Sequence, residues 1–490
     1  MRAVRSIFVA AAALALLSGC AARYFHDAGV PPVPAPRYSL ASLPQNEYWT
    51  GIVFNGAKVG FTHTRVSPAA DKGHYEIDSE AVIHFSFLGY DKRVQMRAVD
   101  TVDENARLLR FEYEYLLDES RQRIAGEVAD GHLRYRVTSA AGDVRETGDE
   151  PLSEPVYPAG ALDLLPVISG LRIGSENRWL VFNGETQQTA EASQRVEAYE
   201  TSDVFEGAAF KVQTEMLGLG TTTWIDTRGR PVFELGLNGV MISALEDEQT
   251  AKNYLASAAL NKADALVDWS LIKAPLPLAD ARRATYLRIV FPGAAGRPPV
   301  SDGRQVCRAA GRDAICEIDA SRPAGPADAA TAALLPSSVV QSRDPMIRNL
   351  AQAIGAGHST VSAKIDAILA WLDNNIRKEP VDTFSALDVL DAKQAECQGH
   401  AYLYTALARA LGVPTRVVNG LVYSGEYKGF LYHTWAESDV DGVWRAVDPT
   451  FGQSRADATH IALVRGENLA DLVPIVDWVG NTRIRVLEAR

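Results

Sequence analysis

The 490-residue sequence contains few cysteines and histidines, and their spacing does not match common metal sites. It has four cysteines and nine histidines, with no Cys-x-x-Cys and no His-x-x-x-His pair. Cys397, His400, His433 and His460 could together supply four zinc ligands, but the usual ligand spacings are missing. No glycine-rich phosphate loop follows a predicted strand either. We therefore expect no metal ion and no other cofactor.

The sequence also lacks a cluster of Lys or Arg. It has 49 basic and 61 acidic residues, a formal net charge of −12. This balance disfavours a nucleic-acid partner. Beyond the first twenty residues no apolar run is long enough to span a bilayer. With 47% hydrophobic and 22% charged residues, the composition is ordinary for a globular protein.

Residues 1–19 have the organisation of a secretion signal, with Arg2 and Arg5 ahead of a short apolar run. The run ends in "LSGC", which resembles the bacterial lipoprotein signal and implies lipidation of Cys20. The alternative is an ordinary secretion signal that happens to contain a cysteine. Several acyl chains would give stable anchoring. We expect a periplasm-facing protein, with Ala21 favouring the outer membrane.

The other three cysteines divide into a pair and a single residue. Cys307 and Cys316 are nine positions apart, and "AAGRD" between them is typical of a turn between two short strands. In an oxidising compartment this pair predicts a disulfide, and two buried free thiols are the alternative. Cys397 has no obvious partner, so it is either buried or chemically active.

The chain divides into a tether and three structural regions. Residues 20–44 are proline-rich and predict an extended tether. Residues 45–243 alternate apolar and polar side chains, with frequent turn signals, which predicts an antiparallel sheet or half-barrel without a catalytic group. "IVFNG" and "LVFNG" could mark two related β units there. Residues 244–335 predict a β-rich connector, and residues 336–490 mix helices and strands, so the fold class is α+β.

Cys397 begins a predicted helix that ends at Gly412-Val413-Pro414. The unpaired N–H groups and dipole at a helix start favour an anion, so we expect a lowered thiol pKa. The alternative is a buried structural cysteine.

His433 and Asp448 lie on two predicted strands that flank the turn signal Asp441-Gly442. A four-residue loop would pair His433 directly with Asp448. A two-residue loop would make the two residues diagonal neighbours, and both loops place the two side chains on one face. A three-residue loop would separate them. Taken singly, His433 could be a half-buried strand residue and Asp448 a turn residue.

Three segments, "ECQGHAYLYTALARALGVPTRVVNGLVY", "YHTWAE" and "WRAVDPTFGQ", resemble the transglutaminase-like superfamily of papain-type fold. The resemblance covers about residues 345–490. It implies that Cys397 is the nucleophile, His433 the base and Asp448 the orienting acid. Ala395 departs from the pattern, because glycine usually stands two positions before the nucleophile.

For the oxyanion hole we expect the backbone N–H of Cys397 and a second donor, with Gln398 preferred and Gln394 or an indole as alternatives. Trp435 is expected to point away from His433. The favoured function is an exported, lipid-anchored cysteine enzyme that cleaves amide bonds of a peptide or protein substrate in the cell envelope. The alternatives are a cross-linking transglutaminase and a non-catalytic envelope binding or assembly module.

Overall fold

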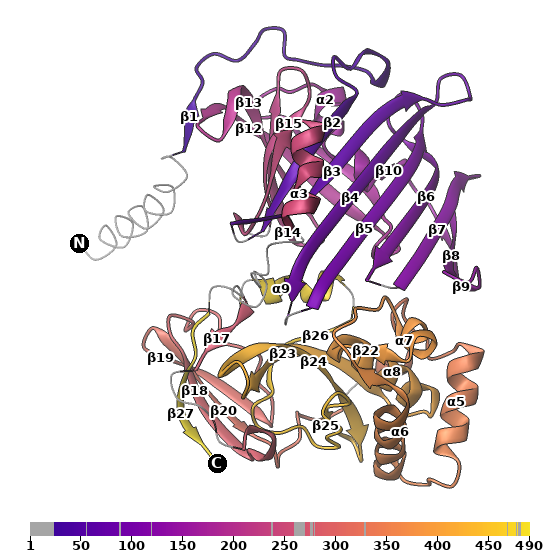
Figure 1. Cartoon of the computed structure of the whole chain (residues 1–490), viewed down its shortest axis with the longest axis vertical. Helices are drawn as coiled ribbons and strands as arrows, with labels where there is room; N and C mark the ends of the chain where they lie inside the picture. The colour runs from indigo at the N-terminus through magenta and orange to yellow at the C-terminus, as the bar shows by residue number, and fades with distance from the viewer. Residues whose placement is uncertain are drawn as a thin grey trace.

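The computed structural model describes residues 24–54, 56–87, 90–118, 120–236, 239–258, 270–274, 278, 280–327, 330–467, 469–476, 478 and 482–490 (Figure 1). The predicted signal segment and its lipidation site, Cys20, lie outside this range. Across the described residues, every helix is too short or too polar to cross a bilayer.

The N-terminal region is one large sheet, as its alternating pattern predicted (Figure 1). Its strands follow the order β10-β11-β12-β13-β14-β15-β16-β2-β3-β4-β5-β6-β7-β8-β9, and β1 pairs with β12. Only β10 and β11 are parallel. Because β16 pairs with β2, the two possible β units form one continuous sheet. The strands are β1 Phe25–Asp27, β2 Glu47–Phe54, β3 Ala57–Pro68, β4 Tyr75–Phe87, β5 Tyr90–Val102, β6 Leu108–Leu117, β7 Ser120–Ala129, β8 His132–Ser139, β9 Val144–Pro151, β10 Val156–Pro158, β11 Glu176–Asn183, β12 Gln188–Ser202, β13 Phe205–Met216, β14 Leu219–Asp226, β15 Pro231–Gly236 and β16 Met241–Glu246.

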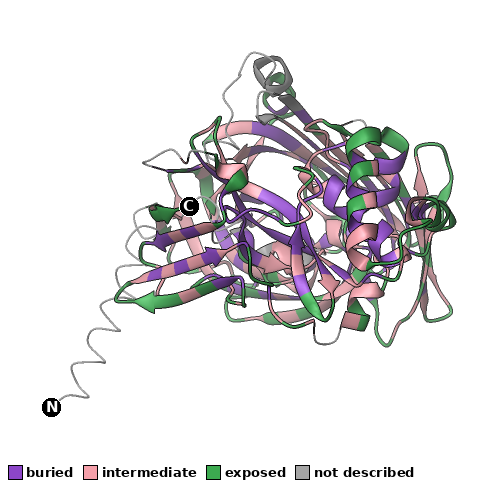
Figure 2. Cartoon of the chain, turned by 90° about the horizontal axis from the view of Figure 1, so that it is seen from below, coloured by how far each residue is buried: buried purple, intermediate pink, exposed green. Residues whose placement is uncertain are grey.

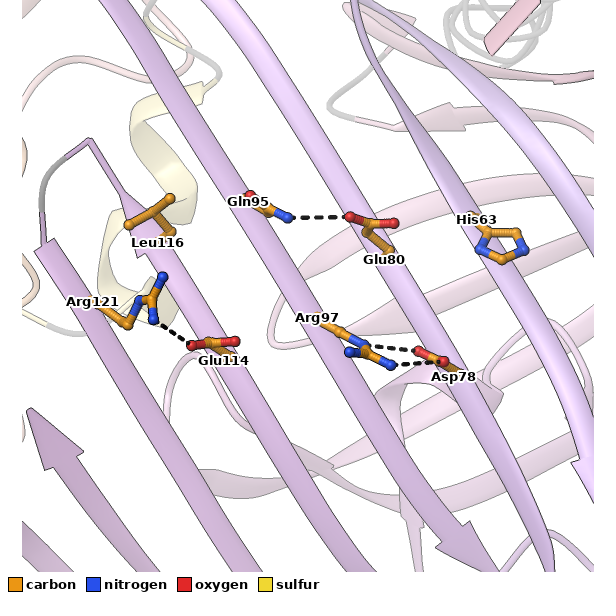
Figure 3. A pocket seen from close by; sticks show the side chains of 8 residues that line it. All are labelled: His63, Asp78, Glu80, Gln95, Arg97, Glu114, Leu116 and Arg121. Carbon is orange, nitrogen blue, oxygen red and sulfur yellow. Dashed lines mark hydrogen bonds and ion pairs between the residues drawn. The ribbon is translucent and has the colours of Figure 1, made fainter. Parts of the chain in front are cut away.

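The outer face of this sheet is charged, and its charges pair across neighbouring strands (Figure 3). Arg97 contacts Asp78 at 3.2 Å, and Arg121 contacts Glu114 at 3.3 Å. Successive side chains of a strand alternate between its two faces. Glu114 of β6 lies on the charged face, whereas Phe111, an odd number of positions away, points to the other face and is buried in the core. Most of the side chains that line the pocket in Figure 3 are therefore paired with one another, and His63 and Leu116 complete the lining.

Short helical segments cover the sheet: η1 (Leu40–Ser42), η2 (Ala159–Ala161), α2 (Leu165–Ser169) and α3 (Glu248–Ala258). The segment expected as an extended tether packs here instead. Phe25 stacks on Trp224 with ring centroids 4.2 Å apart, and Leu40 is buried. Residues 24–44 are thus held against the sheet in part: Phe25 and Leu40 pack on it, whereas Val30 and Val33 are exposed.

The connector is part of the C-terminal domain and not a separate unit. Its strands and a C-terminal strand form one sheet in the order β19-β20-β18-β27, and its apolar face shares a core with Leu421 and Phe430. Cys307 lies directly opposite Cys316 on neighbouring strands, and the predicted disulfide is present. The elements are β17 Ile272–Lys273, η4 Ala281–Arg283, β18 Tyr286–Phe291, β19 Gln305–Ala310, β20 Asp313–Asp319, η5 Ala330–Leu334 and β27 Arg485–Ala489.

The remaining C-terminal elements pack helices against a second sheet, β17-β24-β23-β26, in which β25 also pairs with β24. Figure 2 shows the buried residues gathered in the strands and on one side of the helices. The elements are α5 Pro345–Gly355, α6 Val361–Asn375, β21 Arg377–Lys378, α7 Ala386–Ala392, β22 Gln394–Ala395, α8 Cys397–Ala410, β23 Thr415–Ser424, β24 Gly429–Val440, β25 Val443–Val447, β26 Ile461–Arg465 and α9 Leu469–Val476.

Helix α8 is the central element of this domain. Glu396 caps its start by accepting a hydrogen bond from the Gly399 N–H at 3.0 Å. Gly412 follows its end with a φ of 73°, the left-handed conformation that favours glycine. Gly399 is needed as well, because a Cβ there would lie 2.6 Å from that of Ala395. The departure at Ala395 is thus accommodated by a small residue one turn into the helix.

Candidate active site

Cys397 is the first residue of α8, as predicted, and its thiol is half-buried. The Sγ–H group donates a hydrogen bond to Oε2 of Glu396 at 2.9 Å. On the other side, the backbone N–H of Thr434 in β24 lies close enough to stabilise a thiolate. The helix start and the strand that carries His433 therefore meet at the sulfur.

The expected lowering of the thiol pKa is wrong for this geometry. Burial, the charge of Glu396 and the hydrogen bond to Glu396 raise the pKa of Cys397 well above its ordinary value. The Thr434 N–H acts in the opposite direction but is outweighed. The resting thiol is thus protonated, and a base must remove its proton before it can act as a nucleophile.

The strand register agrees with the two-residue loop. Val440 pairs with Val443, and Asp441 and Gly442 have φ values of 57° and 83°, the left-handed pair of a type I′ turn. The four-residue alternative is wrong. His433 and Asp448 are diagonal neighbours on one face, and the His433 Nε2 lies 2.9 Å from the Asp448 Oδ2. Asp448 orients the imidazole and fixes the proton on Nε2, which leaves Nδ1 free to accept one.

Asp448 is fully buried, and both of its oxygens accept hydrogen bonds. Oδ1 accepts the N–H groups of Thr450 and Phe451 at 2.7 and 3.0 Å. Oδ2 accepts from His433 and from His460, the latter at 2.8 Å. Burial works to raise the pKa of Asp448, but the charges and hydrogen bonds of the two histidines outweigh it and hold the pKa well below its usual range. The carboxylate is therefore ionised.

His460 is a site residue that sequence reasoning missed, since it appeared there only as a possible zinc ligand. It lies beyond the motifs, and the one local signal was Asp457 three positions earlier. Its Nδ1 faces the backbone oxygen of Asp457 at 3.1 Å.

The four residues considered as possible zinc ligands, Cys397, His400, His433 and His460, do not form one group among the described residues. Among the described residues, His433, Asp448 and His460 have donor atoms within 4.8 Å of one another, and the two hydrogen bonds to Asp448 account for this closeness. His400 is directed elsewhere, with its Nδ1 2.9 Å from the backbone oxygen of Glu396.

Cys397 and His433 line the same cavity, which has a volume of about 640 Å³. Most of the wall is apolar or aromatic, and a smaller number of charged groups face in. The aromatic side chains are Tyr423, Tyr427, Tyr432 and Phe451, and the cationic ones are Lys92, Arg282 and Lys378. Such a wall suits a peptide segment whose polar backbone is held at a few points.

The N-terminal sheet contributes Lys92 to this cavity. Strands β4 and β5 run down to the C-terminal domain (Figure 1). Lys92 in β5 is almost fully buried and contacts Asp118 at 2.9 Å and Asp382 at 3.0 Å. Burial and the nearby Glu396 raise the pKa of Asp382 to about 6, although Lys92 opposes the shift. The N-terminal region was expected to hold no catalytic group, and it contributes a cation to the wall of the site.

Of the two glutamines considered as oxyanion donors, only Gln398 lies on the wall of the cavity. Gln398 lines the cavity, but its Nε2 donates to the Tyr402 hydroxyl at 2.7 Å. Gln394 lies outside the cavity wall and accepts from Arg377. The backbone N–H of Cys397 stays a prediction.

The expectation for Trp435 is wrong. It is two residues from His433 on the same strand and therefore shares its face. The ring centroids of Trp435 and His433 are 6.3 Å apart. Its Nε1 is buried, without a hydrogen-bond partner among the described residues.

Comparison with solved structures gives distant likenesses. A "Putative Cysteine Protease from Cytophaga hutchinsonii" is 16% identical, covering 42% of this chain and 86% of that one, with a TM-score of 0.28. A β-barrel-like protein of domain DUF1849 from Brucella abortus is 9% identical, covering 42% and 97%, with a TM-score of 0.32. Neither structure is similar enough to indicate a function for this chain.

No curated protein matches the chain in sequence. The family comparison, by contrast, matches residues 348–449 to the transglutaminase-like superfamily. The matched range contains Cys397, His433 and Asp448 and excludes His460 and the N-terminal sheet. Residues 348–449 are therefore a domain of the transglutaminase-like superfamily.

Proposed function

We propose that the protein is a cysteine-dependent amide hydrolase that acts on peptides or proteins. The observation that supports this most strongly is the buried hydrogen bond between His433 and Asp448, with His433 on the wall of the same cavity as Cys397. A scaffold has no need for an oriented imidazole on the same cavity as a thiol. Cys397, His433 and Asp448 also occur along the chain in the order of nucleophile, base and orienting acid, the three groups that thiol acyl transfer requires.

The proposed reaction begins with proton transfer from the Cys397 thiol to Nδ1 of His433. The thiolate attacks the amide carbonyl carbon and forms a tetrahedral intermediate, whose oxyanion would be held by the Cys397 backbone N–H. The C–N bond breaks as His433 gives its proton to the leaving amine, which leaves a thioester. Water, deprotonated by the same imidazole, attacks the thioester and releases the acid and the thiol.

We favour water over an amine as the acyl acceptor because water needs no second substrate site. The cross-linking transglutaminase remains the alternative, with a primary amine in place of water. A non-catalytic envelope binding or assembly module is the alternative from another class, and the protonated resting thiol is the observation that favours it.

We also propose export and lipid anchoring through Cys20, with the protein facing the periplasm, most favourably from the outer membrane. The disulfide between Cys307 and Cys316 supports an oxidising compartment. The substrate would then be a peptide or protein of the cell envelope.

The test is iodoacetamide labelling of Cys397 across pH, followed by peptide-library cleavage read by mass spectrometry. Cys397→Ala and His433→Ala should abolish cleavage. His358→Ala, which alters an exposed histidine of the same domain, should leave it unchanged. Incorporation of a primary amine without net hydrolysis would identify a transglutaminase. A thiol that stays unreactive at every pH would contradict both enzyme readings.

A further inference from the structure

His460 is fully buried, and both of its ring nitrogens face groups that can only accept hydrogen bonds. Nε2 lies 2.8 Å from the ionised Asp448. Nδ1 lies 3.1 Å from the backbone oxygen of Asp457 and 3.3 Å from its Oδ1. Carboxylates and carbonyls carry no proton to give, so each ring nitrogen must supply one. The geometry therefore requires a doubly protonated, cationic imidazole.

Asp457, on the far side of His460, is itself held in place. Its Oδ1 accepts the Thr459 N–H at 2.9 Å, and its Oδ2 accepts from Gln453 at 3.0 Å. Arg282, from the connector, lies 3.2 Å from the same Oδ2. Burial works to raise the pKa of Asp457, but the histidine, arginine and threonine contacts hold it well below its usual range. Asp457 is thus an anion beside His460.

Arg282 is also linked to His433 through the ring of Phe451. Its guanidinium lies 4.3 Å from the centre of the Phe451 ring. Phe451 in turn stacks on His433 with ring centroids 5.0 Å apart and planes 15° from parallel. The charge alternates in sign along a row of four groups that leads to His433. These groups are Arg282, Asp457, His460 and Asp448. We call these four residues and His433 the extended network.

We propose that His460 is a permanently cationic positioning residue, which holds Asp448 against His433 and offsets part of the carboxylate charge that His433 experiences. This inference rests on the proposed function of Cys397, His433 and Asp448. It adds a fourth side chain, which lies outside the family match at residues 348–449.

The other charged groups around His460 act in both directions, and the carboxylates outweigh the cation. His433 lies edge-on to it with ring centroids 5.6 Å apart. Arg304 is also close and donates to the backbone oxygen of His460 at 3.0 Å and to that of Asp457 at 2.6 Å. Its charge opposes a second cation. Burial also works to lower the pKa of His460, but the bonds and charges of Asp448 and Asp457 outweigh it and raise the pKa.

A cationic His460 should change the proton affinity of His433 in one direction. An imidazolium 2.8 Å from Oδ2 makes the site less negative, so His433 gives up its proton to the leaving amine more readily. A neutral residue at position 460 would strengthen the pull of Asp448 on the His433 proton. With the site more negative, the Cys397 thiol would also keep its proton to higher pH, because the charge of Asp448 raises the pKa of this thiol.

The experiment compares the pH dependence of Cys397 alkylation in the wild type and in His460→Gln. The rising limb, where the Cys397 thiol loses its proton, should move up by about half a pH unit or more, a threefold rate difference below the wild-type limb. Tyr404→Phe, which removes a buried hydrogen bond to Ser438, is the matched structural control and should leave the limb in place. A folded His460→Gln protein with an unchanged limb would overturn the inference.

A second measurement needs no variant at position 460. Imidazole ¹⁵N spectra of the histidine-labelled wild type should show one ring with both nitrogens protonated from pH 5 to pH 9. Absence of such a ring above pH 8 would overturn the inference. If Cys397 is unreactive at every pH, the proposed function fails, and these spectra still decide the charge of His460.

Discussion

The Sγ of Cys397 lies 2.9 Å from the Oε2 of Glu396, the residue immediately before it. Glu396 also caps α8 through its other oxygen, which accepts from the Gly399 N–H. One carboxylate therefore supports the helix that presents the thiol and, through its charge and hydrogen bond, adds to burial in raising the pKa of that thiol. The thiol of Cys397 is kept protonated in part by its neighbour.

Replacing Glu396 by Gln should make Cys397 more reactive at neutral pH. The amide oxygen can still cap the helix, but the negative charge that disfavours the thiolate is gone. The rising limb of iodoacetamide alkylation against pH should shift down by about one pH unit, about tenfold in rate at a fixed pH below it. Glu426→Gln, an equal charge change on an exposed loop of the same cavity, should leave the limb unchanged. An unshifted limb in a folded Glu396→Gln protein would contradict the resting-state interpretation.

Lys92→Met should loosen the attachment of the N-terminal sheet to the C-terminal domain. Lys92 is buried between Asp118 and Asp382, and its loss leaves two carboxylates facing each other. Removing one partner of a buried ion pair costs on the order of 3 kcal/mol. Urea unfolding followed by limited proteolysis should show the two parts separating earlier than in the wild type.

Lys72→Met, at an exposed position in the turn between β3 and β4, is the control for Lys92→Met and should unfold like the wild type. Adding Asp382→Asn to Lys92→Met should restore part of the lost stability. If the double variant is no better than the single one, the pair does not couple the two parts.

Reduction of the disulfide should destabilise the C-terminal part of the chain. Cys307 and Cys316 close a loop of sequence separation nine. Loop-closure entropy predicts a loss of about 2–3 kcal/mol in the free energy of unfolding. Denaturation with and without dithiothreitol measures this difference. The double variant Cys307→Ser/Cys316→Ser should unfold like the reduced wild type, and dithiothreitol should not change its stability. A wild type whose stability is also unchanged by dithiothreitol would refute the prediction.

Asp100 predicts a pH dependence of stability in the N-terminal sheet. It is fully buried, and its Oδ1 accepts the Tyr113 hydroxyl at 2.6 Å. Burial raises its pKa from 3.8 to about 7, although the Tyr113 bond opposes the shift. The folded state thus binds this proton more tightly than the unfolded state. The contribution of Asp100 to stability is therefore fully present below pH 4, falls as pH rises toward 7, and is lost above it.

Asp100→Asn should remove this fall. A shift of this size corresponds to about 4 kcal/mol at full effect. Urea unfolding between pH 4 and 8 should therefore show wild-type and variant stabilities diverging as pH rises. Burial also raises the pKa of Asp163 to about 6 and of Glu234 to about 8, but both groups are present in the two proteins. Parallel profiles would show that Asp100 is not the titrating group.

Much of the site could be predicted from sequence because its signals are local. The Asp441-Gly442 pair specifies a type I′ turn, and this turn sets the register that brings His433 to Asp448. The start and end of α8 follow from Glu396 and Gly412. The pair Cys307 and Cys316 follows from a hairpin with the right spacing. In each case the residues that specify the feature lie close together in the chain.

The contacts that the sequence did not reveal join segments with no shared periodicity or turn. Lys92 meets Asp382 across 290 positions, and Arg282 reaches Asp457 from the connector. The pKa of Cys397 is raised, contrary to the expectation from its helix start, because desolvation and the Glu396 charge outweigh the hydrogen bond from the Thr434 N–H. The sequence alone determines the place of Cys397 at the start of its helix and the His–Asp register, since these depend on local geometry. The charges that surround them depend on burial and long-range packing, which arise only when the whole chain is folded.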